Sequence, residues 1–433
     1  MSERIKLGLT RNRLFEFDNC VCFTGKLREE LDFSECEKSL KLLFLKEPLL
    51  SCSVELSEEG DAFLVTDSVE PKLEMLEGDE NVLVEQKKRV GLNFNEKLFS
   101  FAVINKNTFA IFAHTLVADV RALSYLAMEF MSFYKKEKVS AEPSQIMVFS
   151  ESSQLLSNVF SVVIDRVASG LEVGWQKKVH HFSFADYQKA REKYFAEKSQ
   201  TETLSAKLDG DMLNTLKEFS RAEKTDVSSL VAYAFYEALT EELAGKRKYK
   251  KLNVQANERP FFEDFQNMKT GAFNGVVTVV LKKNKNTPQN PEGRAAAFHK
   301  EIYKKITTAF SVFYNEVLFM RLSGSFCDSQ YMYCAGLLKH KYSKRLALTY
   351  GCANLVAGEF SSMNFNQESW KKLSVFDEIS VSEPLKMRSS SLVTFTEQAL
   401  YGGISFEYKI NEIPKIKGEK IFEHALEILK NLI

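Results

Sequence analysis

Hydrophobic and polar positions alternate in short runs through the first third of the chain. Runs typical of β-strands lie at residues 20–25 and 99–113, and a segment with helical spacing lies between them at 34–45. After the last strand, the apolar residues of VRALSYLAMEFMSFY (120–134) recur at intervals of three and four, which predicts an amphipathic helix. A buried strand therefore leads into a helix through a short turn, HTLVAD.

A change of pattern separates the two halves of the chain. The polar stretch at 135–145 ends the first long helix, and residues 159–178 are poorly patterned apart from one short stretch with helical spacing. We place the crossover between domains within residues 140–182. The predicted domains are residues 1–165 and residues 166–433.

The second half begins again with a strand, which is followed by capped helices. Asp209 and Asp226 each precede a helical pattern in the position of an N-cap. Both halves are mixed α and β and of similar size. The pattern predicts strands at 204–208, 252–256, 272–281, 346–350, 392–396 and 404–408, and helices at 294–313 and 418–433.

The segment HTLVADV (114–120), between a strand and a helix, resembles the HHxxxDG signature of condensation domains, carrier-dependent acyltransferases and alcohol acetyltransferases. His114, Asp119 and their spacing carry the match, and the order of the later elements is similar too. The resemblance implies an α/β fold made of α+β two-layer sandwiches. Two chloramphenicol-acetyltransferase-like lobes would form a V-shaped pseudo-dimer with a channel between them.

Two residues of the motif differ from the signature. Thr115 stands where the family has its second histidine, the proposed general base, and Val120 stands where it has glycine. Threonine does not take up a proton near neutral pH, so the usual mechanism lacks its base. His114 is the remaining candidate base, because a one-residue bulge would turn it into the channel. The alternative is a strand-end histidine that is satisfied by the backbone.

The resemblance also implies roles for residues around the channel. Asp119 would form a structural salt bridge with Arg259 of the other lobe, although its type and place also suit an N-cap of the helix from Val120. Both roles can hold together. Asn274 and Asn354 match family positions that bind substrate, and the alternative is that both are turn residues.

Composition excludes several other classes of function. Fifty-eight basic residues balance fifty-eight acidic ones, so no net field draws the chain to nucleic acid. The seven cysteines are scattered without a CxxC pair, and the doublet His180–His181 has no further ligand at metal spacing, so we expect neither a metal nor structural disulfides. No apolar run approaches the roughly 20 residues of a membrane span. The sequence reads as a cytoplasmic protein that is not transmembrane.

Two functional hypotheses follow from the motif. The first is a condensation-type acyltransferase that transfers an acyl group from a thioester to a small amine or alcohol acceptor. Its donor would be acyl-CoA or the phosphopantetheinyl thioester of an acyl carrier protein, with no bound cofactor. The second is a catalytically inactive module that binds a carrier protein or an acyl ligand. A third reading, another two-layer α/β protein, stays open because order of elements alone does not determine function.

Overall fold

The structure is a computed structural model of the 433-residue chain. It describes residues 3–57, 60–137, 142–146, 161–175, 181–198, 200–243, 250–262, 269–281, 288–352, 356–364, 376–398 and 401–433.

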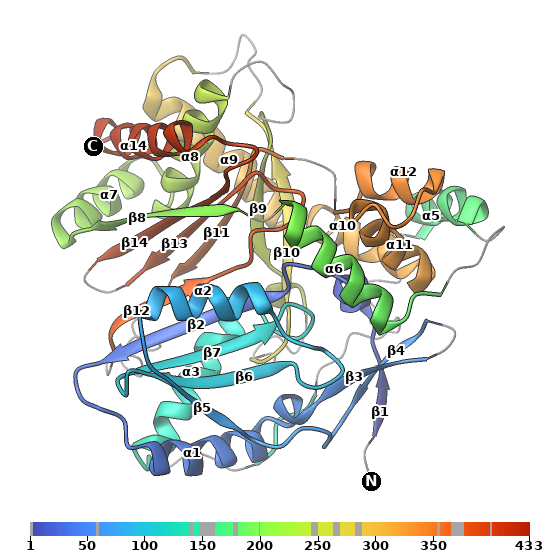
Figure 1. Cartoon of the computed structure of the whole chain (residues 1–433). Helices are drawn as coiled ribbons and strands as arrows, with labels where there is room; N and C mark the ends of the chain where they lie inside the picture. The colour runs from blue at the N-terminus through green and yellow to red at the C-terminus, as the bar shows by residue number, and fades with distance from the viewer. Residues whose placement is uncertain are drawn as a thin grey trace.

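A five-stranded sheet forms the lower lobe in Figure 1. Its pairs are antiparallel except for β5 with β6, and all residues of β6 and β7 are buried. Layers cover both faces, which explains why these two strands read as continuous apolar runs. In spatial order the strands are β12 (Phe376–Ser382), β2 (Cys20–Leu27), β7 (Thr108–His114), β6 (Phe99–Ile104) and β5 (Leu73–Leu76).

A six-stranded mixed sheet forms the upper lobe (Figure 1). The strand β11 runs parallel to both of its neighbours, while the remaining pairs are antiparallel. In spatial order the strands are β10 (Asn274–Val279), β9 (Leu252–Asn257), β11 (Gly358–Asn364), β13 (Ser391–Glu397), β14 (Gly402–Lys409) and β8 (Thr201–Leu208). A small third sheet, close to the N-terminus, holds β1 (Arg4–Lys6), β4 (Ala62–Val65) and β3 (Ser53–Leu56).

Helices pack against both of the large sheets. In the lower lobe, α1 (Phe33–Lys46) and α3 (Val120–Tyr134) pack on one face, and α2 (Glu80–Val90) lies on the other. The upper sheet carries α7 (Gly210–Ala222), α8 (Val227–Glu242), α9 (Pro291–Ile306) and α14 (Lys415–Asn431). The side of the molecule opposite α7 holds α5 (Ser161–Trp175), α6 (Phe184–Lys198), α10 (Ala309–Met320), α11 (Gly324–Cys334) and α12 (Lys341–Thr349). Among the described residues, short 3-10 helices are η1 (Leu9–Arg13), η2 (Pro48–Ser51) and η4 (Arg259–Phe261).

Each lobe has its own large hydrophobic core, but the chain exchanges segments between them. Strand β12 comes from the second half and pairs with β2 of the first half. Its residues Phe376, Ile379 and Val381 belong to the core of the lower lobe. The two lobes are therefore linked by a crossing strand as well as by the chain between them. The division at residues 165 and 166 stays a prediction.

Most of the predicted elements are present, and two are wrong. Asp209 and Asp226 cap α7 and α8 by accepting hydrogen bonds from Met212 and Ser229. The strand predicted at 346–350 is instead the end of α12, because only Ser343, Leu346 and Ala347 of this helix are buried, a spacing of three and four. The helix predicted at 294–313 is two helices, α9 and α10, separated at Thr307 and Thr308.

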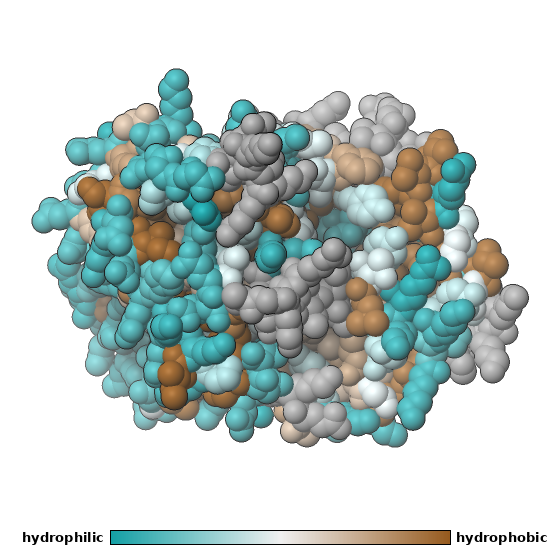
Figure 2. Space-filling model, turned by 90° about the horizontal axis from the view of Figure 1, so that it is seen from above, coloured by the Kyte–Doolittle hydropathy of each residue, from teal (hydrophilic) through white to brown (hydrophobic). Residues whose placement is uncertain are grey.

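The surface is not uniform. Figure 2 shows mainly hydrophilic side chains on the side of α7 and α14 and more hydrophobic ones on the side of α5 and α12. Val162, Val163 and Val173 of α5 are exposed. No helix in the described ranges combines the length and the apolar character that crossing a membrane requires.

Candidate active site

The motif turn begins at His114, the last residue of β7. Cys20 of β2 pairs with His114, so the ladder runs to the end of the strand without the bulge that would turn this side chain. The imidazole is fully buried, and its Nδ1 accepts a hydrogen bond from the backbone N–H of Leu116 at 3.1 Å. His114 thus supports the turn from inside.

Electrostatics keep this imidazole neutral. Burial, and to a smaller extent the charges of Lys386 and Arg191, lower the pKa of His114 to about 3. Because Nδ1 accepts, we assign the ring proton to Nε2, which has no hydrogen-bond partner in the described residues. The only basic lone pair of the ring is therefore already used by the backbone. In this arrangement His114 cannot collect a proton from a substrate.

Thr115 is tied into a charged network. Its backbone N–H donates to the carbonyl of Asn19 at 2.8 Å, and its hydroxyl donates to Oε2 of Glu16 at 3.1 Å. The same carboxylate oxygen accepts from Nζ of Lys386 at 2.6 Å. The position to which the sequence resemblance assigns the general base thus holds a neutral donor to an ion pair.

Asp119 performs both of the roles considered for it. Its Oδ1 accepts from the N–H of Ala122 at 2.9 Å, which caps α3. The guanidinium of Arg259 in η4 donates to both carboxylate oxygens, at 2.7 and 3.2 Å. Burial alone would raise the pKa of Asp119, but the charge and hydrogen bonds of Arg259 outweigh it and the pKa is lowered.

Backbone contacts join the same turn to the other lobe. Ala118 forms a parallel bridge with Gly271, whose carbonyl accepts from Arg259 at 3.2 Å. The N–H of Phe273 donates to Asp119 at 3.0 Å, and the phenyl ring lies under the guanidinium. We call Asp119, Arg259, Gly271 and Phe273 the interlobe joint.

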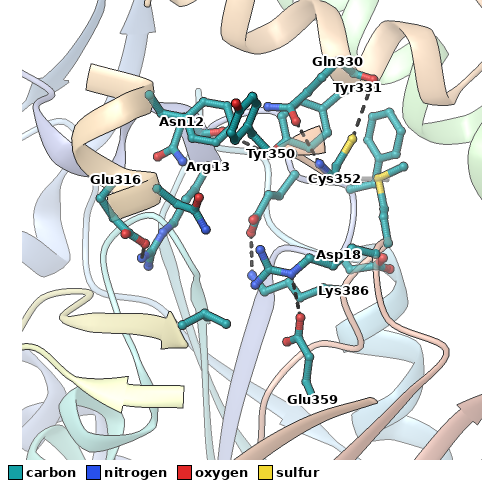
Figure 3. A pocket seen from close by; sticks show the side chains of 18 of the residues that line it. Asn12, Arg13, Asp18, Glu316, Gln330, Tyr331, Tyr350, Cys352, Glu359 and Lys386 are labelled. Atoms are coloured by element: carbon teal, nitrogen blue, oxygen red, sulfur yellow. Dashed lines mark hydrogen bonds and ion pairs between the residues drawn. The ribbon is translucent and has the colours of Figure 1, made fainter. Parts of the chain in front are cut away.

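A cavity of about 80 Å³ lies next to this region, between the segment that precedes β2 and the strands β9 to β11. Figure 3 shows Arg13 and Glu316 on one side of it, with Gln330, Tyr331 and Cys352 on the opposite side. We call it the central cavity. Its wall comprises Asn12, Arg13, Glu16, Phe17, Asp18, Gln255, Asn274, Val276, Asn315, Glu316, Phe319, Gln330, Tyr331, Tyr350, Gly351, Cys352, Glu359, Lys386, Met387 and Arg388.

Every cation on this wall has an anionic partner in the wall itself. Lys386 pairs with Glu16 at 2.6 Å, and Arg388 pairs with Glu359 at 2.7 Å (Figure 3). Arg13 lies 3.7 Å from Glu316 and also donates to the side chain and the carbonyl of Asn274. The positive charges of the wall are therefore already used within the protein.

Unlike the cations, some of the acceptor oxygens of the wall residues have no partner among the described residues. Three buried oxygens, Oδ1 of Asn12, Oδ2 of Asp18 and Oε2 of Glu316, have no hydrogen-bond partner among the described residues. The wall has four carboxylates (Glu16, Asp18, Glu316, Glu359) and three cations (Arg13, Lys386, Arg388), one carboxylate more than cations, and the buried cation Lys409 lies near Asp18. Burial raises the pKa of Asp18 to about 6, against the nearby charge of Lys409, and burial also raises the pKa of Glu316.

Comparison with known proteins gives the fold. No protein-family model and no curated protein sequence matches the chain. Among solved structures, the condensation domain of the Monacolin K polyketide synthase MokA matches with a TM-score of 0.64 and 11% identity, over 99% of this chain and 96% of that one. The chain has the condensation-domain fold.

Two further structures of the condensation-domain fold show how far the likeness extends. The trichothecene 15-O-acetyltransferase TRI3 from Fusarium sporotrichioides has a TM-score of 0.65 at 12% identity, over 100% of this chain and 95% of that one. The epimerization domain of the third module of tyrocidine synthetase B has a TM-score of 0.61 at 14% identity, over 99% and 98%. The fold of two chloramphenicol-acetyltransferase-like lobes is thus confirmed over the whole chain.

The predicted site residues lie in three different places within this fold. Asp119 and Arg259 meet at the interlobe joint. Asn274 lines the central cavity, but its amide oxygen already accepts from Arg13 at 2.8 Å. His114 and Thr115 are absent from the cavity wall, and Thr115 reaches it only through Glu16. Asn354 lies outside the described residues.

The sequence patterns did not single out Glu16, Asp18 and Glu316. A signal was present, because the charged residues Glu16 and Asp18 alternate with the apolar residues Phe15 and Phe17 directly before β2. Charged residues in such a segment are rarely buried unless they have partners or a function. Among the described residues, no group of three or more His, Cys, Asp or Glu is arranged to hold a metal ion.

Proposed function

We propose that this chain is a binding protein of the condensation-domain fold that holds a small organic ammonium ion in the central cavity. A single observation carries the proposal. The wall combines unpartnered acceptor oxygens with an excess of one carboxylate. This chemistry calls for a ligand that brings N–H donors and positive charge.

The energetics favour such a ligand. A buried acceptor without a partner costs roughly 1–3 kcal/mol, and three such acceptors belong to residues of this wall. A primary ammonium has three N–H donors and one positive charge, so it satisfies several acceptors at once. The rings of Phe17, Tyr331 and Tyr350 on the same wall suit a cation and its hydrocarbon part.

The imidazole route to acyl transfer has no support from this geometry. Thr115 is not basic, and the lone pair of His114 is used by the N–H of Leu116. No histidine is among the described residues of the cavity wall. Binding without the family's general-base step is therefore the function that the site supports best.

A second candidate function is acyl transfer in which Asp18 replaces the imidazole. Its pKa of about 6 lies close to working pH, as general-base catalysis requires, and one of its oxygens is unpartnered. A bound amine would attack the thioester carbonyl of an acyl-CoA or carrier-bound donor. The new C–N bond would form as the C–S bond breaks, and the amine proton would pass through Asp18 to the leaving thiolate. The carrier protein and the acyl donor stay predictions.

Calorimetric titration with butane-1,4-diamine tests the binding proposal. We expect saturable binding of the diamine. Butane-1,4-diol, which has donors but no charge, and tetramethylammonium, which has charge but no N–H donor, should both bind at least tenfold more weakly. Equal affinity for all three compounds, or binding of none, would reject the proposed ligand class.

Variants locate the binding and separate the two functions. Asp18→Asn should weaken diamine binding at least tenfold, while Asp211→Asn, an exposed aspartate of α7, should leave it unchanged. Mass spectrometry after incubation of the wild-type chain with the diamine and acetyl-CoA then detects an N-acetyl product. Binding without product supports the first function, and product that disappears in Asp18→Asn supports the second.

A further inference from the structure

Two of the seven cysteines differ from the others in their surroundings. Cys20, Cys22, Cys36, Cys52 and Cys327 are buried, whereas Cys334 and Cys352 are half-buried. The sulfur atoms of Cys334 and Cys352 lie 3.2 Å apart, although the residues are 18 positions apart in the chain. They come from separate segments, the end of α11 and the corner after α12.

The side chain of Gln330 fixes the second cysteine against the helix that carries the first. Its amide oxygen accepts from the backbone N–H of Cys352 at 2.9 Å (Figure 3). Gly351 fits closely on the same amide, because a Cβ at this position would lie 1.8 Å from that oxygen. The N–H groups of Tyr350 and Gly351 both donate to the carbonyl of Leu346. The corner at 350–352 is therefore held in place, and the sulfur contact does not depend on a loose loop.

We propose that Cys334 and Cys352 form a dithiol site that low-molecular-weight disulfides oxidise to an intramolecular disulfide. One thiolate attacks the small disulfide, which gives a mixed disulfide and releases one small thiol. The second cysteine then attacks the protein sulfur of that mixed disulfide and releases the other small thiol. Two electrons pass from the protein to the small disulfide, and the two protons lost by the protein end on the two small thiols.

The geometry favours this pair over the other cysteines. Closing the bond brings the two sulfurs roughly 1 Å closer, which small side-chain rotations achieve. Cys20 and Cys22 are also near in sequence, but both are buried under α2 and burial raises the pKa of Cys20 to about 12. Burial and the contact with Cys334 also raise the pKa of Cys352. We therefore expect oxidation to be slow at neutral pH and to accelerate as pH rises.

The position of the pair links its redox state to the central cavity. Cys352 lines the cavity next to Gly351 and Tyr350. Disulfide formation would draw this corner toward α11 and fix it there. The small disulfide thus acts on the wall of the ligand site without entering it.

Mass spectrometry of the full chain in mixtures of reduced and oxidised glutathione tests this assignment. After acid quenching and alkylation, we expect the oxidised chain to have five alkylatable thiols in place of seven and no bound glutathione. A peptide map should join Cys334 to Cys352. Seven free thiols throughout, or a disulfide between other cysteines, would reject the assignment, and neither outcome depends on the proposed ligand.

Single variants show that the two cysteines act together. Cys334→Ser and Cys352→Ser should each leave a stable mixed disulfide with glutathione, because the resolving thiol is missing. Cys36→Ser, which removes a buried thiol from another part of the fold, should oxidise as the wild type does. Oxidation of the wild type should also raise Tm by a few degrees, because the cross-link restricts the unfolded chain. Six alkylatable thiols and no bound glutathione in both Cys334→Ser and Cys352→Ser would contradict the proposal.

Discussion

The interlobe joint and the central cavity both bury charged side chains between the two lobes, but the buried carboxylates differ in their hydrogen-bond partners. At the joint, both oxygens of Asp119 accept from Arg259, and backbone N–H groups of Ala122 and Phe273 complete the shell. In the cavity, Asp18 and Glu316 each keep an oxygen without a partner. At the joint the protein itself supplies every hydrogen-bond partner of the carboxylate, whereas in the cavity a ligand or water has to supply the missing donors.

This difference separates a structural role from a binding role. A buried ion pair whose hydrogen bonds are all made holds two segments in one geometry, and removing one partner is costly. Unpaired buried acceptors give nothing to the folded state and persist where a ligand or water supplies the donors. The residues of the interlobe joint therefore stabilise the fold, whereas the unpartnered carboxylate oxygens of the central cavity are available to bind a ligand.

Breaking the joint should have the largest effect. Arg259→Leu leaves Asp119 buried without its cation, so the free energy of unfolding should fall by about 3–5 kcal/mol. Urea denaturation measures it. The double variant with Asp119→Asn should recover part of the loss, because the uncompensated charge is gone. A loss below about 1 kcal/mol for Arg259→Leu would show that the joint is not a major structural contact.

Changing the cavity should affect binding more than folding. Glu316→Gln replaces a carboxylate that has an unpartnered oxygen, so the affinity for butane-1,4-diamine should fall about tenfold, or about 1.4 kcal/mol. Glu218→Gln, at an exposed position of α7, is the matched control. Titration calorimetry measures both. Unchanged affinity in Glu316→Gln would remove this residue from the binding site.

Thr115 connects the motif to the cavity through a single hydrogen bond. Thr115→Val removes the donor to Glu16 with little change of shape, and the free energy of unfolding should fall by about 1 kcal/mol. Thr115→Ser keeps the hydroxyl and removes the methyl group, so it measures the contribution of packing separately. If Thr115→Val loses no stability, the hydrogen bond to Glu16 does not contribute at this position.

The effect that depends on pH should come from Asp18. Because the pKa of Asp18 is raised to about 6 in the folded state, its stabilising contribution is complete below the unfolded pKa of about 4 and is lost as pH rises through about 6. Asp18→Asn should therefore stabilise the free protein more near pH 7.5 than near pH 4.5. Urea midpoints at the two pH values test the sign, and a gain that is larger at the lower pH would contradict it.

The sequence by itself determined the local elements and one long-range contact. The turn HTLVADV between a buried strand and an amphipathic helix follows from apolar spacing and from the capping ability of Asp119. The pairing of Asp119 with Arg259 came from the resemblance, and the structure contains it. The strand predicted from periodicity at 346–350 was wrong, because the short helix α12 buries only three of its residues and so has a weak hydrophobic pattern.

Only the tertiary structure decided what the motif faces and where a ligand fits. Whether His114 points into a cavity depends on strand register and on the N–H of Leu116, which no local pattern encodes. The central cavity gathers side chains from η1, α10, α11, β9 to β11 and the segment between β12 and β13, so its charge balance exists only after folding. The contact between Cys334 and Cys352 likewise requires α11 and α12 to pack together. Sequence spacing determines which side chains share one face of a helix or strand. Residues from distant segments determine how deeply those side chains are buried, which partners they bind and which charges surround them. These surroundings determine the chemistry of the site.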